Sequence, residues 1–543
     1  MPASHARLRR IEWLAFAVLL VAEFLLFDQV GAKHHTWIYP RWNDQIQYLS
    51  EAYTGFEYSR AHGLAAGLWH TLVNPTAQGT LHDFWAVLVF QVAGPSRSAA
   101  LAVNLLAFLA WQATWFFAVR RVFGSRALAW TSAGLLLALA SPWSGIQGSA
   151  TDFRLDWMAA GALGVTLAAA LLTAGFRHRG WAVAFGAAVG VTLLTRFLTG
   201  TYFILIFAAL LCGTLAGSQR GRRTVNLLIA AATALVLAGP LMWLSREEIV
   251  HYYWIGHFIG PESAIRNQNM GVWRSIIWLG KSLACDHLGL LWLWAVGSAT
   301  FALLVMACWP RKSRLAAPPG TSAGWFLAAT FLLAPALVLV LHQQKSFAVV
   351  GILLPGAVLL VLTAWSELGA RLPPWVHTAL AVLSLGVGGS FFVQRMLANP
   401  HTPGFLVDAR KVATLADTIF DRARAAGLAQ PRVGTDHITD CLDGQVLRVI
   451  CYERKQVWEP FDMTLPISIA EAPEADIMER LARSDFVFLS DAGYVGIYPY
   501  DRQMRALHPR LRAWCDAHLR LVDQFQLFGR SMMLYQRREI PLP

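Results

Sequence analysis

The residues best placed to do chemistry are charged groups at the predicted outer ends of apolar segments. Asp44 follows the first long apolar segment and stands between Trp42 and Tyr48, and such aromatic rings favour the membrane interface. Beyond it, apolar side chains recur with helical spacing at Ile46, Leu49, Tyr53 and Phe56. The pattern predicts a carboxylate held at the membrane surface at the start of an amphipathic helix. It could have a functional role at that surface or simply cap the helix.

A second predicted loop, 144–156, carries three more charged side chains. Asp152 and Asp156 are four residues apart with Arg154 between them, so the two acids would share a face if the segment were helical. Acids also stabilise the N-terminus of a helix. A catalytic role and a structural one are therefore both open for this pair.

Two cations lie at the predicted outer ends of spans, against the general charge trend. These are Arg196 and Lys345, and beside acidic loops they suit a bound phosphate better than a lipid surface. Snorkelling towards water is the alternative. Glu23 lies inside the first apolar segment, where an ionisable group is by default a functional candidate, although it could pair with a neighbouring span. His251 is a further candidate, in a Trp- and His-rich segment that could cover a site or anchor at the interface.

The chain that must position these residues has the composition of a membrane protein. It has 543 residues, of which 56% are hydrophobic and 14% charged. Apolar runs near the length of about 20 residues that spans a bilayer recur until about residue 397. They predict about eleven spans, near 11–29, 97–119, 127–143, 157–175, 181–198, 201–217, 224–244, 287–309, 323–341, 347–364 and 375–397. The first reads as a retained anchor, because no small-residue cleavage site follows it.

The net charge of +12 is explained by where the cations lie. One set of short loops is rich in Arg and Lys, whereas the intervening loops hold most of the acids. This asymmetry is the positive-inside pattern, so a nucleic-acid partner is not implied. It places the N-terminus inside and three larger segments outside, at 30–96, 144–156 and 245–286.

After about residue 398 the composition becomes that of a soluble domain. A helix is predicted over 408–428, with short apolar runs at 432–435, 446–452, 486–489 and 532–535 and helical stretches near 474–482 and 501–519. This alternation predicts a small α/β domain over 398–543. Cys441 and Cys451 flank a turn-like Asp443-Gly444 and could pair across a hairpin or stay reduced. No metal-type Cys/His spacing appears.

The order and sidedness of these residues resemble a known family. An Asp-x-x-x-Tyr (Asp44, Tyr48) with amphipathic helices, an Arg-x-Asp (Arg154, Asp156), and a later span opened by Lys345 with Pro355 ten residues on precede a soluble outer domain. This arrangement is similar to the GT-C membrane glycosyltransferases, especially the bacterial branch of protein O-mannosyltransferases and the lipid A aminoarabinose transferase.

The resemblance implies a polyprenyl-phosphate sugar donor and an inverting transfer. It implies that Asp44 is the general base, that Lys345, Arg154 and Arg196 bind the donor phosphate, and that Asp152 and Asp156 support them. Two departures matter. Many relatives have Glu where this chain has Gln45. The metal-using oligosaccharyltransferases have Asp-x-Asp in this loop, where this chain has Trp42. We therefore expect no required metal, with Mg²⁺ or Mn²⁺ as the alternative.

The sequence thus predicts an α-helical polytopic membrane protein with a GT-C-like transmembrane domain, 1–397, and an extracytoplasmic α/β domain. It would be a glycosyltransferase of the bacterial inner membrane, with its site facing the periplasm and with a lipid, glycan or protein as acceptor. Two alternatives are a transporter or flippase of lipid-linked glycans and a non-catalytic envelope assembly protein. A transporter predicts Gly/Pro-broken spans with polar groups near mid-membrane, but here the polar residues gather at the outer ends.

Overall fold

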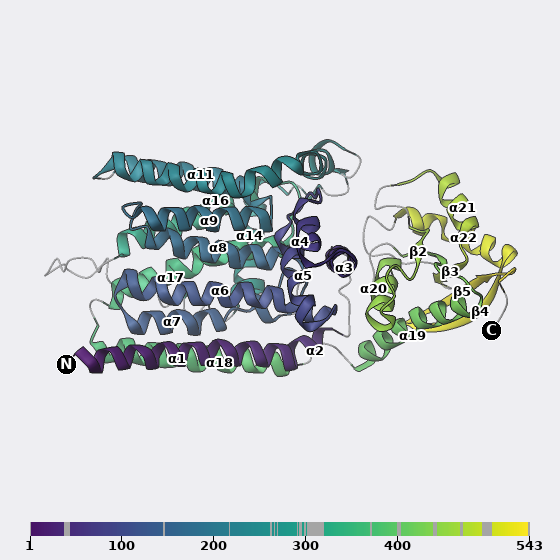
Figure 1. Ribbon diagram of the computed structural model, residues 1–543, viewed down its shortest axis with the longest axis horizontal. Helices are drawn as coiled ribbons and strands as arrows, with labels where there is room; N and C mark the ends of the chain where they lie inside the picture. The colour runs from purple at the N-terminus through teal and green to yellow at the C-terminus, as the bar shows by residue number, and fades with distance from the viewer. Residues whose placement is uncertain are drawn as a thin grey trace.

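The computed structural model has two parts, a bundle of long helices and a smaller unit containing a β-sheet (Figure 1). We call them the helical bundle and the sheet unit (residues 403–540). The structure describes residues 2–36, 44–144, 147–216, 218–260, 263–264, 267–268, 270–289, 292, 296–297, 300, 320–369, 372–398, 403–437, 443–466, 471–490 and 502–540.

Within these ranges, seven helical segments are long and apolar enough to cross a membrane. They are α1 (Pro2–Leu26), extended by η1 (Phe27–Gly31) and α2 (Ala32–His35), then α6 (Arg97–Phe123), α8 (Leu155–Leu172), α11 (Arg220–Leu244), α16 (Thr321–Leu341), η5 (Phe347–Leu353) with α17 (Leu354–Gly369), and α18 (Pro374–Leu397). Shorter helices in the bundle are α7 (Arg126–Leu137), α9 (Arg179–Thr195) and α10 (Thr199–Leu215). The predicted span at 287–309 lies mostly outside the described residues, so the count of eleven stays a prediction.

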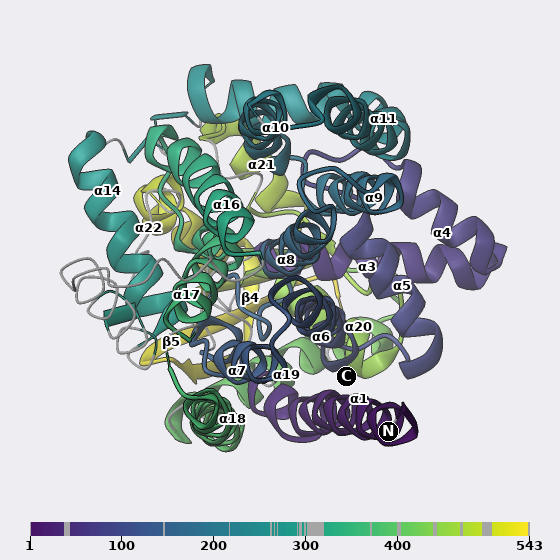
Figure 2. The ribbon, with the colours of Figure 1, turned by 90° about the vertical axis from the view of Figure 1, so that its left-hand side faces the viewer.

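The bundle is organised around α8. Seen along the bundle, α8 lies among α6, α9, α16 and α17 (Figure 2), and almost all of its residues are buried. Small residues allow this close packing. The ring of Trp111 on α6 lies so close to Gly164 of α8 that an added Cβ would come within 2.4 Å of it. By contrast, α11 turns Leu235 and Val236 outward, as expected of a helix that faces lipid.

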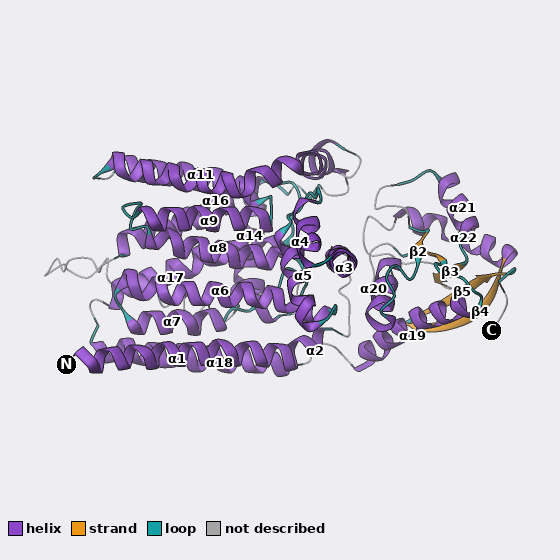
Figure 3. Cartoon of the chain, viewed as in Figure 1, coloured by secondary structure: helices purple, strands orange, loops and turns teal. Residues whose placement is uncertain are grey.

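Three helices, which we call the juxtamembrane helices, lie between the ends of the spanning helices and the sheet unit (Figure 3). They are α3 (Asp44–His62), α4 (Leu64–Val73) and α5 (Leu81–Ala93). The apolar face predicted for the first of them is confirmed, because Ile46, Leu49, Tyr53 and Phe56 are all buried. A later connection on the same side contains α12 (Arg246–Ile249), η3 (Val250–Ile259), α14 (Val272–Lys281) and η4 (Ser282–Leu288).

The sheet unit has five strands in the order β2-β1-β3-β5-β4. They are β1 (Arg432–Thr435), β2 (Asp462–Met463), β3 (Phe486–Ser490), β4 (Leu519–Leu527) and β5 (Arg530–Arg537), and the helices are α19 (Pro403–Ala425), α20 (Gly444–Lys455), α21 (Glu474–Arg483) and α22 (Arg502–His518). β1 is parallel to both β2 and β3, whereas β5 is antiparallel to β3 and β4. The β4–β5 turn is Phe528-Gly529, both with positive φ, as a two-residue hairpin requires.

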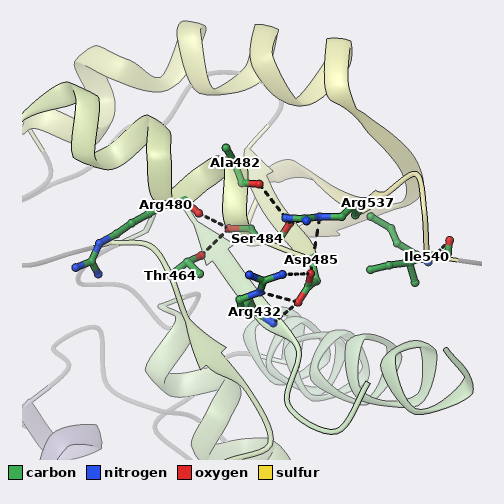
Figure 4. Close-up of polar contacts among 9 residues, drawn as sticks. Arg432, Thr464, Arg480, Ala482, Ser484, Asp485, Arg537 and Ile540 are labelled. Atoms are coloured by element: carbon green, nitrogen blue, oxygen red, sulfur yellow. Dashed lines mark hydrogen bonds and ion pairs between the residues drawn. The ribbon is translucent and has the colours of Figure 1, made fainter. Parts of the chain in front are cut away.

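Polar side chains connect the three central strands, β1, β3 and β5, at one end of the sheet (Figure 4). The guanidinium of Arg432 donates to Asp485 Oδ1 at 2.9 Å, and its backbone N–H donates to Asp485 Oδ2 at 2.9 Å. Arg537 donates to the Ala482 and Ser484 carbonyl oxygens at 2.8 and 3.0 Å. These bonds satisfy the backbone groups where α21 ends and β3 begins.

Helix α20 contains both the apolar run 446–452 and Cys451. The apolar run 446–452 lies in helix α20 and not in a strand, because Asp443 caps a helix by accepting a hydrogen bond from the Gln445 N–H at 3.1 Å. Cys451 is therefore a buried free thiol inside a helix and does not lie on a hairpin strand. Cys441 falls outside the described residues.

Candidate active site

The start of α3 meets the start of α8 through one buried arginine. Arg154 Nη1 lies 3.1 Å from Asp44 Oδ2, and Arg154 Nε lies 2.9 Å from Asp152 Oδ2. The Arg154 side chain is 3% exposed, whereas that of Asp44 is 43% exposed. Burial alone would lower the pKa of Arg154, but the charges of Asp44 and Asp152 raise it. Arg154 therefore remains a cation and holds an accessible carboxylate in place.

Asp152 and Asp156 do not share a helical face, because the segment that joins them is not a single helix. Helix α8 begins at Leu155, and Asp152 lies before it, where its Oδ2 accepts the Gly148 N–H at 2.8 Å. Asp156 lies in the first turn of α8 and forms an ion pair with Arg196. Each acid thus has its own arginine, so the four residues form two adjacent ion pairs.

Arg196 comes from the end of α9, where the backbone leaves the helix in an extended conformation. Its side chain is 13% exposed, and that of Asp156 is 7% exposed. A largely buried cation beside the first turn of α8 has limited access to water. Its guanidinium pairs with Asp156 and does not extend into the aqueous phase, as snorkelling would require.

A cavity of about 80 Å³ is lined by both the Asp44–Arg154 and the Asp156–Arg196 ion pairs. Asp44, Tyr48, Arg154, Asp156 and Arg196 all line it. Burial and the charge of Asp44 raise the pKa of Tyr48 far above its ordinary value, so its phenol stays protonated and can donate a hydrogen bond. The sequence analysis did not select the other polar and aromatic residues of the lining, which are Gln78, Tyr202, Tyr252, Tyr253, His257, His342, Gln344 and Ser346.

The π-helix η3 contributes three residues to the cavity, but His251 is not one of them. Tyr252, Tyr253 and His257 line the cavity, whereas His251 is exposed and is not among the lining residues. In a π-helix residues i and i+5 come together, and His257 Nδ1 lies 2.8 Å from the Tyr252 carbonyl oxygen. The cluster of Tyr and His residues in the sequence indicated this segment. An α-helical spacing could not show which of those residues face the cavity, because the segment is a π-helix.

Lys345 lies next to the cavity, and its ammonium has three protein acceptors. The Nζ donates to carbonyl oxygens at the end of α16 and just beyond it, at 3.0, 2.8 and 2.6 Å, those of Leu339, Val340 and His342. A cation that satisfies the last carbonyls of a helix is a C-terminal cap. Its neighbours Gln344 and Ser346 line the cavity, and Gln344 Oε1 lies 2.7 Å from His257 Nε2. Lys345 therefore fixes the loop that forms one wall.

Glu23 does not belong to this cluster. It is buried on α1, and its Oε1 accepts a hydrogen bond from Gln112 Nε2 of α6 at 2.7 Å. Its position matches the alternative in which it pairs with a neighbouring span. Among the described residues, no group of three or more His, Cys, Asp or Glu side chains could hold a metal ion.

A second polar cavity, of about 160 Å³, lies between α3, α4 and α5 and contains Glu51 and Asp83. Burial raises the pKa of Asp83 to about 8, and burial together with the charge of Asp83 raises that of Glu51 to about 7. The buried His82 beside them has its pKa lowered to about 4, chiefly by burial. The packing between the juxtamembrane helices is therefore sensitive to pH.

We expect Asp83→Asn to stabilise the protein increasingly as the pH rises from about 4 to about 8. The folded protein keeps the Asp83 proton up to about pH 8, whereas an ordinary Asp loses it near pH 3.8. Stability from this group is thus complete below about pH 4 and is lost as the pH rises towards 8. In detergent, the Tm of Asp83→Asn should exceed that of wild type by several degrees at pH 8.5 and by little at pH 5. Glu247→Gln, at an exposed acid, is the control, and equal shifts at both pH values would contradict the prediction.

Comparison with known proteins finds similar solved structures but no similar sequence family. No protein-family model matches the chain, and no curated protein matches it. The crystal structure of ArnT from Cupriavidus metallidurans in the apo state aligns with a TM-score of 0.63 at 18% identity, over 97% of this chain and 98% of ArnT. Its structure bound to undecaprenyl phosphate aligns with a TM-score of 0.59 at 17% identity, over 98% and 99%.

The archaeal oligosaccharyltransferase AglB from Archaeoglobus fulgidus aligns with a TM-score of 0.46 at 11% identity, over 97% of this chain and 75% of AglB. The two ArnT alignments include both the helical bundle and the sheet unit. The chain therefore has, over essentially its whole length, the fold of ArnT.

Proposed function

We propose that the protein is an inverting glycosyltransferase of the inner membrane. It would move a sugar from a polyprenyl-phosphate donor to an acceptor hydroxyl at the outer face of that membrane. One observation carries the proposal: an accessible carboxylate, Asp44, and two largely buried arginines line one cavity beneath the juxtamembrane helices. The fold adds support, because ArnT has been solved with undecaprenyl phosphate bound.

The chemistry follows from these groups. Asp44 would accept the proton of the acceptor hydroxyl as its oxygen attacks the anomeric carbon. The bond between that carbon and the phosphate oxygen would break, and the released lipid phosphate would gain negative charge. Arg196 and Arg154 would stabilise that charge in a site with little water, and the lipid tail would lie between the spanning helices. No metal is required in this scheme.

The orientation of the helical bundle in the membrane is proposed from the charge of the loops that connect its helices. Arg120, Arg121, Arg177, Arg220 and Arg222 gather at the end of the bundle away from the sheet unit. By the positive-inside rule that end faces the cytoplasm. The cavity, the juxtamembrane helices and the sheet unit would then face the periplasm of a bacterial inner membrane. In that position the site meets a donor carried by the outer leaflet.

The function can be tested in a deletion strain and then with purified protein. Mass spectrometry of the cell-envelope lipids and glycans should show one glycosylated component missing, restored by the wild-type gene and not by Asp44→Asn. Purified protein in liposomes should then transfer that sugar from a synthetic polyprenyl-phosphate donor to that component, at the same rate with or without EDTA. A flippase would restore the component in cells but form no product in the purified system, and a rate that EDTA abolishes would contradict the metal-free scheme.

Lys345 gives a separate prediction, since its ammonium caps α16 beside the cavity. We expect Lys345→Ala to lower both Tm and turnover, because the wall carrying Gln344 and Ser346 loosens. Lys345→Arg should restore part of both, since the charge survives while the geometry changes. Turnover that falls with Tm unchanged would instead assign the ammonium to the donor phosphate, as the family resemblance implies. Unchanged turnover would remove Lys345 from the site.

A further inference from the structure

A larger cavity, of about 740 Å³, lies at the opposite end of the bundle from the candidate active site. The ends of α6, α8, α9, α10, α11 and α16 surround it. Four basic side chains line it, and the lining residues include no acid: Arg121, Arg177, His178 and Arg223. We call it the basic cavity.

The fold holds one of these side chains, Arg223, in place. Arg223 of α11 donates from Nε to the Gly175 carbonyl oxygen at 2.6 Å and from Nη2 to the Gly213 carbonyl oxygen at 3.2 Å. The α8–α9 loop is thereby fastened to the ends of α10 and α11. In the same loop, Ala174, Gly175 and Phe176 all have positive φ, so the chain turns sharply just before Arg177 and His178.

The cations of the basic cavity differ from others at this end of the bundle. Arg120 and Arg126 both pair with Glu12, so part of the nearby positive charge is neutralised within the protein. Among the described residues, by contrast, no acid forms an ion pair with the three arginines or with His178 of the basic cavity. The positive-inside rule explains why cations lie on this side. It does not explain why these four converge on one hollow without a counter-ion.

One wall of the cavity is apolar and reaches the lipid-facing surface, although Thr173, Thr214 and Ser322 also belong to the lining. Leu171, Leu210 and Leu327 form part of the wall. Phe326 also lines the cavity, is 41% exposed, and lies where α16 packs on Gly213 of α10. An occupant could therefore place a charged group among the arginines and a hydrocarbon chain along the apolar wall.

We propose that the basic cavity binds the phosphate head group of an anionic phospholipid from the leaflet at this end of the bundle. Arginine matches phosphate oxygens with paired N–H groups, and basic pockets between helices on the cytoplasmic side are suited to anionic lipid head groups. A free phosphate ion would satisfy the cations but would leave the apolar wall empty. The site is independent of the transfer proposed above.

Native mass spectrometry of delipidated protein, titrated with phosphatidylglycerol, phosphatidylcholine or inorganic phosphate, tests the proposal. Phosphatidylglycerol should bind at least about tenfold more tightly than phosphatidylcholine, and the double variant Arg121→Gln/Arg177→Gln should lose most of that difference. Arg220→Gln/Arg222→Gln is the matched control, because it removes the same charge from exposed residues of the same end that do not line the cavity. Equal loss in the control, or no preference in wild type, would overturn the proposal.

A second measurement needs no variant and remains valid if the double variant fails to fold. Phenylglyoxal modifies accessible arginines, and peptide mapping of the wild-type protein reports each position. Phosphatidylglycerol should protect Arg121 and Arg177 but leave Arg220 reactive. Equal protection of all three would indicate general attraction to the surface. Protection by inorganic phosphate alone, at the level given by the lipid, would replace the lipid with a free anion. Either result would overturn the proposal.

Discussion

Asp44→Asn is expected to fold and insert normally but to transfer sugar about 10²–10⁴ times more slowly, the usual cost of removing a general base. Asp44 is the accessible member of the ion pair with Arg154, with 43% of its side chain exposed. It is also placed where an acceptor from outside and a donor from the membrane could meet. Asn keeps the size and the start of α3, so the cavity should persist, but the amide cannot accept the proton.

The control for this variant is Asp28→Asn. Asp28 lies in η1 at the same end of the bundle but does not line the cavity, so its loss should leave turnover unchanged. Turnover would be measured per folded molecule, with Tm and gel filtration as checks on folding. Wild-type turnover in Asp44→Asn would reduce Asp44 to a helix-terminal residue and make Asp156 the leading candidate for the base.

Arg154→Gln should cost about 3–5 kcal/mol of stability, as expected when one partner of a buried ion pair is removed. Asp152 is 3% exposed and would be left without its cation, while Asp44 would lose the group that fixes its position. Turnover should therefore fall together with stability. Arg154→Lys keeps the charge, but its single ammonium cannot reproduce the planar fork that now contacts both acids, so we expect only partial recovery.

A double variant separates the two effects of Arg154. In Arg154→Gln/Asp152→Asn the buried site carries neither charge, so most of the lost stability should return while turnover stays low. Thermal unfolding in detergent and turnover with the same donor would be measured side by side. Recovery of turnover together with stability would mean that Arg154 matters only for folding and has no part in the transfer.

Two kinds of feature could be predicted from the sequence. They depend on the helical spacing of apolar residues and on which end of a predicted span a residue occupies. The amphipathic face of α3 follows from apolar spacing alone. Asp44, Arg154, Asp156 and Arg196 could be assigned to one surface because each lies at the outer end of a predicted span. In the structure these four residues line one cavity, as residues at the same end of neighbouring helices can.

The pairing of those charges could not be read from the sequence. Asp152 and Asp156 have the spacing of a helical pair, but the helix begins between them at Leu155, and a boundary shift of a few residues is within the error of such predictions. The run 446–452 is apolar and short, so a strand and a buried helix were equally consistent with it. The partners of Lys345 are carbonyl oxygens, which every residue has, so no side-chain pattern indicates them.

The contact between α3 and α20 has a consequence for how the protein could respond to other molecules. The Tyr53 hydroxyl of α3 donates to Glu453 of α20 at 2.6 Å, and the Tyr452 hydroxyl of α20 donates to Glu57 of α3 at 2.5 Å. Because Asp44 begins the same helix, a partner that tilted the sheet unit would also displace the carboxylate in the cavity. Linkage is reciprocal, so a ligand in the cavity would change the affinity of that partner by the same factor. Binding of a partner to the sheet unit and binding of a ligand in the cavity would then be coupled.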